Sequence, residues 1–310
     1  MTQAAQRSIG DGRETQNPLP SWVPAVIGAA GAVIGMLPWW ITGARLPLQN
    51  VWVDTPPAAM PIALLPFSQY AISLVVGLLV TGAAAAGLTL RLLRARLPRR
   101  STLLALGGVL LVQVVAIAQT AVVASTGLRE DWRADLYYAA LLSGVVVTTL
   151  LGGAVLALLA AAPLAGAIIG AAGGALAFSF WLAGLSAALG SAGSPFLPLL
   201  EAVRWAPAVL IGFAIGWWGV ASAGRAVAAI GALAMLWLVP GVTTGLGNAV
   251  GSRVLANDLP SMLSYGLEVT RMALTMPELV MPPLIVAIIV AVLVGAARWA
   301  MRRARPAQQH

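Results

Sequence analysis

The chain has no cysteine, no lysine and a single histidine, and each absence excludes a class of chemistry. Without cysteine there is no disulfide and no thiolate metal site. Without lysine there is no phosphate-binding P-loop. Because the histidine is His310, the last residue, an imidazole within the fold is excluded as a general base or metal ligand. We therefore expect no metal and no cofactor.

Charged residues are also scarce. They make up 9% of the 310 residues, and hydrophobic residues make up 60%. A soluble protein has roughly 25% charged residues. So few polar groups cannot cover a water-facing surface, so lipid must surround most of the chain. The composition predicts an all-α, polytopic membrane helical bundle without a large soluble domain.

The charges that are present separate into two groups. Five of the 18 basic residues, all arginines, fall within one decapeptide, and such a cluster marks the cytoplasmic side by the positive-inside rule. They are Arg91, Arg94, Arg96, Arg99 and Arg100. With this loop inside, the inner loops and tails carry a net charge of +10 and the outer loops −2. The asymmetry sets the membrane orientation of every apolar run.

About eight apolar runs can cross a bilayer as helices. The predicted spans are residues 22–42, 69–90, 102–126, 137–162, 164–189, 206–222, 226–240 and 281–297. The predicted outer loops are residues 43–68, 127–136, 190–205 and 241–279. One transmembrane domain, residues 21–298, is thus flanked by cytoplasmic tails, residues 1–20 and the basic residues 299–310.

The basic inner face predicts a lipid partner rather than a nucleic acid, because anionic headgroups attract arginines next to a membrane. An arginine-only basic set with many alanines and glycines is typical of a GC-rich bacterial genome. We therefore expect a bacterial cytoplasmic membrane. A membrane-protein partner or a homo-oligomer is also possible on this pattern.

Two features inside the spans suggest helix packing. Gly166, Gly170 and Gly174 lie four residues apart on one face, where small residues let helices approach closely. This face serves packing within the bundle or, as the alternative, contact with a second molecule. Gln113 is an amide near mid-membrane, so it must face another helix or a cavity. It joins two helices or contacts a substrate.

No aspartate, glutamate, lysine, arginine or histidine lies inside any predicted span, which disfavours an ion-coupled transporter. Eight of the ten acids fall in outer loops instead. Asp54, Glu130 and Asp131 are the candidate catalytic groups for an outward-facing enzyme on a lipid-linked substrate. The alternative is that these acids are solvated charges that help to set the orientation.

Residues 241–279 are the best candidate for a site. Four glycines open this segment, and Asp258 followed by Pro260 is typical of a helix start. An amphipathic helix is predicted over residues 261–276, with Glu268 and Arg271 as an i, i+3 pair and possible binding residues beside Asp258. Such a helix lies on the interface or re-enters the bundle. It is a structural lid or a lid over a lipid or peptide site.

Three functions remain open from the sequence. The first is a module without catalytic chemistry, either a membrane subunit that binds a partner protein or a permease-like transport protein for an apolar or lipid substrate. The second is the outward-facing enzyme, and the third is the ion-coupled transporter. The inventory of residues favours the first and leaves open whether the chain is an enzyme.

The predicted orientation can be tested with cysteines, because the chain has none of its own. A cysteine replacing Leu255 should react with a membrane-impermeant thiol reagent on intact cells. A cysteine replacing Ala95 should react only after the cells are opened. Labelling of both positions from the same side would contradict the orientation.

Overall fold

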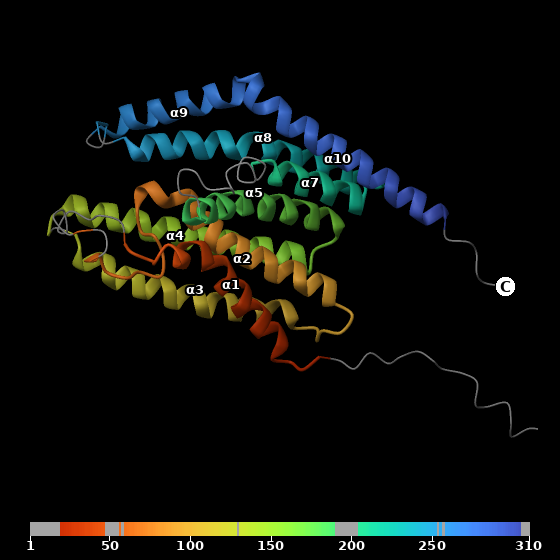
Figure 1. Ribbon diagram of the computed structural model, residues 1–310, viewed down its shortest axis with the longest axis horizontal. Helices are drawn as coiled ribbons and strands as arrows, with labels where there is room; N and C mark the ends of the chain where they lie inside the picture. The colour runs from red at the N-terminus through yellow and green to blue at the C-terminus, as the bar shows by residue number, and fades with distance from the viewer. Residues whose placement is uncertain are drawn as a thin grey trace, which may run out of the picture.

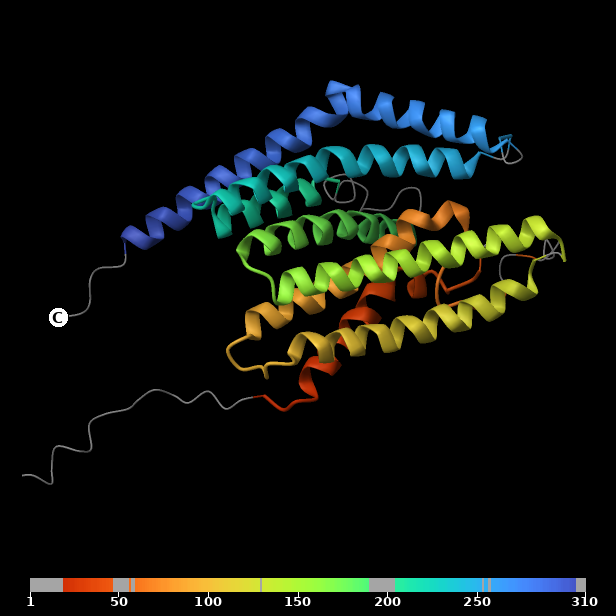
Figure 2. The same ribbon diagram turned by 180° about the vertical axis from the view of Figure 1, so that it is seen from behind.

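The computed structural model describes residues 19–46, 56, 59–128, 130–189, 204–252, 254–255 and 258–304. Within these ranges the chain forms nine α-helices that lie side by side (Figures 1 and 2). They are α1 (Val23–Ile41), α2 (Ile72–Leu93), α3 (Ser101–Thr126), α4 (Trp132–Ala160), α5 (Leu164–Leu189), α7 (Ala206–Trp218), α8 (Ala223–Gly251), α9 (Leu259–Thr275) and α10 (Pro277–Arg303). A 3-10 helix, η3 (Gln69–Ala71), precedes α2.

Seven of the described helices are long and apolar enough to cross a membrane, so the chain is an all-helical, multi-pass membrane protein. The predicted span at residues 206–222 differs from this pattern. Its helix, α7, has 13 residues and is therefore about 20 Å long, shorter than a hydrocarbon layer of about 30 Å. Pro207 lies in its first turn, and Gly219, with φ of +71°, ends it. The glycine stops the helix before the apolar residues run out.

Two groups of helices meet at α5. In the first group, α2 packs against α1, α3, α4 and α5, and 56% of its most apolar window is buried, the highest share among the seven spanning helices. On its other side, α5 packs against α7 and α8. The helices α9 and α10 form the outer edge of the second group, where α9 lies on α8 and α10 lies on α7 (Figure 1).

The helix α8 is longer than its predicted span. We expected it to end at Pro240 and to lead into an outer loop, but it continues to Gly251. A proline inside a helix removes one backbone hydrogen bond. In this turn the Thr243 and Thr244 hydroxyls donate to the Pro240 carbonyl, at 3.0 and 2.8 Å. Part of the predicted loop at residues 241–279 is therefore helical and packed.

The proline-rich residues 59–68, here called the cap segment, run in a mainly extended form among the ends of α1 and α3. Ala63 and Leu65 are fully buried. The indole nitrogens of Trp39 and Trp40 donate to the carbonyls of Ala63 and Leu64, at 2.8 and 3.1 Å. These bonds tie the segment to the last turn of α1.

The side chain of Gln119 in α3 binds the cap segment as a neighbouring strand would. Its amide oxygen accepts from the Leu64 nitrogen, and its amide nitrogen donates to the Ile62 carbonyl, both at 2.9 Å. The hydroxyl of Thr120, which is fully buried, accepts from the Leu65 nitrogen at 2.9 Å. Gln119 and Thr120, two polar residues of an apolar helix, thus form hydrogen bonds with three backbone groups of the cap segment. The segment itself is not part of a regular β-sheet.

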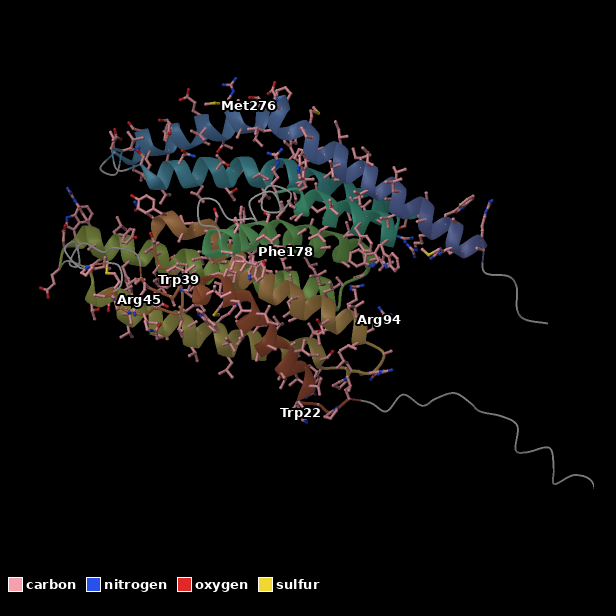
Figure 3. The ribbon with its side chains drawn as sticks, in the orientation of Figure 1. Trp22, Trp39, Arg45, Arg94, Phe178 and Met276 are labelled. Atoms are coloured by element: carbon pink, nitrogen blue, oxygen red, sulfur yellow. The ribbon has the colours of Figure 1, made fainter. Side chains whose placement is uncertain are left out.

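The opposite end of the bundle, here called the basic end, carries arginines that bind helix carbonyls. Arg91 donates to the carbonyls of Leu159 and Ala162 at the end of α4. Arg225 donates to the last carbonyl of α7, on Trp218, at 2.9 Å. The last carbonyls of a helix have no partner within it, so a guanidinium there stabilises the helix end. Figure 3 shows Arg94 at this end and Arg45 near the cap segment.

Close packing of α1 on α3 predicts an effect of substitution at Gly108. A Cβ atom there would lie 2.9 Å from the Ala29 nitrogen, so Gly108→Ala forces the helices apart. We expect it to lower the stability by about 1–3 kcal/mol, measured as a lower melting temperature in detergent. The neighbouring Gly107 faces open space, and Gly107→Ala should leave the melting temperature unchanged or higher. Equal effects of the two changes would contradict this packing.

The hydrogen bonds of Gln119 with the cap segment predict a second effect of substitution on stability. Gln119→Met keeps the size of the side chain but leaves the Leu64 N–H and the Ile62 carbonyl without their partner. Because the site is partly exposed, we expect a loss of about 1–3 kcal/mol in thermal unfolding. Val115→Met, one turn earlier on an exposed position of α3, is the control and should be neutral. An unaffected Gln119→Met protein would show that the amide contacts are dispensable.

Candidate functional site

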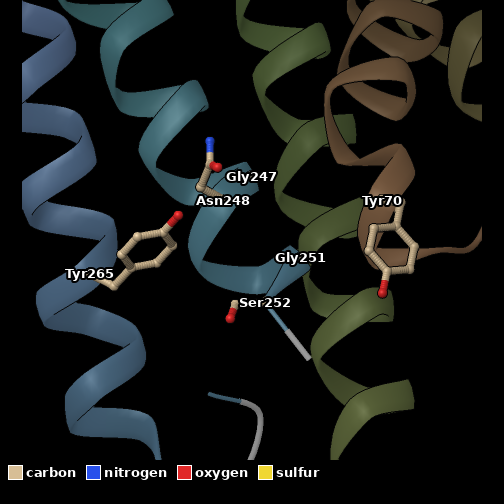
Figure 4. Close-up of a pocket in the computed structure, with 6 residues that line it drawn as sticks. All are labelled: Tyr70, Gly247, Asn248, Gly251, Ser252 and Tyr265. Atoms are coloured by element: carbon tan, nitrogen blue, oxygen red, sulfur yellow. The ribbon is translucent and has the colours of Figure 1, made fainter. Parts of the chain in front are cut away.

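A cavity of about 370 Å³ lies at the end of the bundle opposite the basic end (Figure 4). It is formed by the consecutive helices α8 and α9 and by η3, which lies far from them in the sequence. The described residues that line it are all uncharged: Tyr70, Gly247, Asn248, Gly251, Ser252 and Tyr265. Two of the four glycines that mark the start of the predicted 241–279 segment are among them.

Glycines set one wall of the cavity by bringing α8 and α9 together. A Cβ atom on Gly266 would lie 2.8 Å from the Cβ of Ala249, which shows how closely the two helices approach. This packing places Tyr265 of α9 beside Asn248 of α8, and the Tyr265 hydroxyl points toward Asn248 (Figure 4). The Asn248 amide nitrogen donates to the Thr244 carbonyl at 2.9 Å, so the amide is oriented by its own helix.

The opposite wall is Tyr70 in η3 (Figure 4). The Ser68 side chain, which is buried, accepts from the Tyr70 nitrogen at 3.3 Å and caps this short helix. The Tyr137 hydroxyl of α4 accepts from the Gln69 nitrogen at 3.4 Å. The cap segment therefore leads directly into the cavity wall, and both are anchored to the first group of helices.

The described lining offers hydrogen-bonding groups and aromatic faces. Two phenols, an amide and a hydroxyl offer hydrogen bonds, and the phenol rings offer flat apolar faces. Among the six lining residues there is no carboxylate or imidazole to act as a general base at neutral pH. The described residues also contain no cluster of three or more potential metal ligands from His, Cys, Asp and Glu.

The candidate at Gln113 lies elsewhere, between α2 and α3. Its side chain is fully buried, and its amide nitrogen donates to the Leu79 carbonyl at 3.0 Å. Its amide oxygen has no partner within the part of the chain that the structure describes. The contact with Leu79 joins two helices of the first group and is remote from the cavity lining.

The glycine face of α5 packs within the chain. Added Cβ atoms on Gly170 and Gly174 would lie 2.9 Å from side-chain atoms of Leu158 and Ala84, on α4 and α2. Gly166 meets Ala162 in the same way, at 2.7 Å. This face is occupied by the protein's own helices, which leaves it no room for a second molecule.

The candidate acids that the structure describes lie at helix starts or on the surface. Asp54 lies outside the described residues, and Glu130 is exposed. Asp131 is the N-cap of α4 and accepts from the Arg133 nitrogen at 3.5 Å. Asp258 is the N-cap of α9, where it accepts from the Ser261 hydroxyl and amide at 2.6 and 3.1 Å. The described acids among the candidates thus act at helix starts or stand in solvent.

The placement of Asp258 has a clear electrostatic basis. The bonds from Ser261 hold the pKa of Asp258 below its usual range, because they stabilise the charged carboxylate. Glu268 and Arg271, the remaining candidates, are exposed on α9 and do not line the cavity. The segment predicted as a site therefore supplies cavity residues, but not the charged ones.

Sequence reasoning did not identify Tyr70, Asn248 or Tyr265 as site residues. A signal was present, because the chain has only four tyrosines and two of them line the cavity. Tyrosine favours the boundary between apolar and aqueous layers, where a site for an amphiphilic ligand would lie. The sequence pattern alone could not predict that η3 and the end of α8 lie next to each other.

Comparisons with known proteins give no match: no family model fits the chain, and neither curated proteins nor solved structures show significant similarity to it. The function must therefore be argued from the cavity and from the surfaces of the helices.

Proposed function

We propose that this chain is a non-catalytic, permease-like membrane module that binds an amphiphilic lipid, with the lipid's uncharged polar part in the cavity between α8, α9 and η3. The observation that carries the proposal is the lining, which joins aromatic faces to neutral hydrogen-bonding groups. The cavity volume of about 370 Å³ also lies within the usual range for small-molecule sites.

The uncharged lining favours a neutral, hydroxyl-bearing headgroup over a phosphate or a carboxylate. An anion in a site of low dielectric needs a cationic or strongly donating partner. Among the described residues that line the cavity there is no arginine, whereas Asn248 and the two tyrosines can pair with hydroxyl groups. Sugar and glycerol headgroups carry such hydroxyls together with apolar C–H faces that pack on aromatic rings.

The position of the cavity fits a lipid as well. On the positive-inside rule the basic end faces the cytoplasm, so the cavity opens at the outer surface of the membrane. Beside the cavity, α8 presents Val242 and Leu246, which are 49% and 48% exposed. An acyl chain can follow these side chains while the headgroup occupies the cavity.

Binding can be tested with the purified chain in nanodiscs that contain either a neutral monoglucosyl diacylglycerol or anionic phosphatidylglycerol. Native mass spectrometry of the released protein should show retention of the glycolipid in preference to the anionic lipid. We expect Asn248→Ala and Tyr265→Ala to reduce that retention about tenfold, through loss of hydrogen bonds and ring contact.

The matched control is Leu267→Ala, two residues from Tyr265 on an exposed face of α9 and outside the cavity lining. It should retain the glycolipid as the unchanged protein does. Equal retention of both lipids, or retention that survives both cavity substitutions, would argue against a headgroup site here.

A further inference from the structure

The helix α9 lies against the half of α8 that leads to the cavity. A Cβ atom on Gly245 of α8 would lie 2.5 Å from the Gly266 carbonyl oxygen of α9. A Cβ atom on Gly241 would lie 2.6 Å from a methyl group of Leu274. The two helices are antiparallel, so α9 runs from the cavity end toward the middle of α8 (Figure 1).

The position of α8 places α9 at membrane depth. Arg225 in the first turn of α8 lies at the basic end, and its last residue, Gly251, lies near Tyr70 at the cavity end. These 29 residues span about 43 Å, more than a hydrocarbon layer of about 30 Å. Leu274 meets Gly241, about midway along α8. The second half of α9 is therefore level with the apolar part of a spanning helix.

A break joins α9 to α10 at this depth. Met276 has an extended backbone, with ψ of 107°, and Pro277 starts the next helix (Figure 3). The Trp237 indole of α8 donates to the Leu274 carbonyl at 3.1 Å, close to the break. Backbone groups released at such a break need partners in an apolar medium, and here a side chain supplies one. The helix α10 that follows the break is itself long and apolar enough to cross a membrane.

Four polar residues form an exposed stripe on α9, on the side away from α8. Steps of four, three and four residues place them within roughly 60° around the helix. They are Ser264, Glu268, Arg271 and Thr275, here called the α9 stripe. Apolar side chains flank the stripe: Leu263, Leu267 and Met272 are 56%, 71% and 53% exposed. This pattern is typical of a helix whose polar side packs against another protein surface.

Glu268 and Arg271 make no ion pair or side-chain hydrogen bond within the described part of the chain, although they are one turn apart. A charged side chain that faces hydrocarbon is costly, and such residues usually pair with each other or face a protein interior. The α9 stripe points away from the helices that the structure describes. None of the described residues covers it, so its charged side chains can take a partner from a second molecule.

We infer that the α9 stripe is an interface with a second copy of this chain, related by a two-fold axis parallel to the bundle. Such an axis keeps both copies in the same membrane orientation and presents the same surface twice. Each copy contributes one acid, Glu268, and one base, Arg271, one turn deeper. Two copies thus form a neutral cluster of four charges in which each acid can reach the base of the partner subunit.

The small residues of the stripe support the same arrangement. Ser264 and Thr275, on either side of the charged pair, allow two helix backbones to approach and can bond across them. The prominent glycine faces elsewhere in the described structure are used within the chain: α5 packs on α4 and α2, and Gly212 of α7 packs on Ala287 of α10. A partner with charges of one sign would leave either Glu268 or Arg271 unpaired.

This inference does not depend on lipid binding in the cavity. The cavity lies on the side of α8 and α9 that faces η3, whereas the stripe faces away from α8. The two sites use different residues, so either can fail without the other.

Cross-linking in native membranes tests the interface, because the chain has no cysteine of its own. Ser264→Cys places a thiol on the stripe, where two copies bring it near its counterpart, and mild oxidation should give a disulfide-linked dimer. Leu267→Cys is at least as exposed on the same helix but lies off the stripe, and it should give at least fivefold less dimer, on the order expected for separated thiols.

Exchanging the charges of the Ser264→Cys variant tests whether the dimer depends on ion pairs between the two copies or only on the proximity of the two thiols. Glu268→Arg gives the cluster four bases and should reduce dimer formation strongly. The double change Glu268→Arg with Arg271→Glu restores one acid and one base per copy and should restore the dimer. Three outcomes would overturn the inference: equal cross-linking at positions 264 and 267, no recovery in the double variant, or cross-linking of Ser264→Cys to a different protein.

Discussion

The pairing of backbone groups in an apolar surrounding is the constraint on which this structure depends. Within a helix the constraint is met automatically, so the informative places are those where the chain leaves a helix. The cap segment is paired by Gln119 and Thr120, and the break between α9 and α10 is bound by Trp237. At the basic end Arg91 binds the last carbonyls of α4. The polar side chains at these places thus form hydrogen bonds with backbone groups that lack a partner within a helix.

The same constraint explains how two groups of helices become one molecule. The helix α5 has small residues on its faces and packs on both groups, while its partner α2 carries few groups that need water. The cap segment and η3 extend the first group toward the end of α8. The cavity forms where that extension meets α8 and α9, so its walls come from both groups, and its shape depends on how they are joined.

Composition and periodicity predicted the helical membrane class well, because sparse charge and long apolar runs act along the whole chain. They failed where a single residue decides the geometry. Pro240 was expected to end a helix, but α8 continues through it to Gly251. Gly219 was not expected to stop α7 as early as it does. Of the candidate site, the segment around Gly247 and Gly251 was predicted, but Tyr70 was not, because only the fold brings it there.

The bonds that hold the cap segment also impose an order on biogenesis. Trp39 and Trp40 reach carbonyls 24 residues later in the chain, but Gln119 and Thr120 lie 55 residues beyond the amides they bind. At about 5–20 residues per second of synthesis, those 55 residues take about 3 to 11 seconds to emerge. During this interval residues 59–68 can bond to the two tryptophans and to residues 44–46, but not yet to Gln119 and Thr120. The insertion machinery must therefore release an unfinished hairpin of α1 and α2, which is sealed when the third helix arrives.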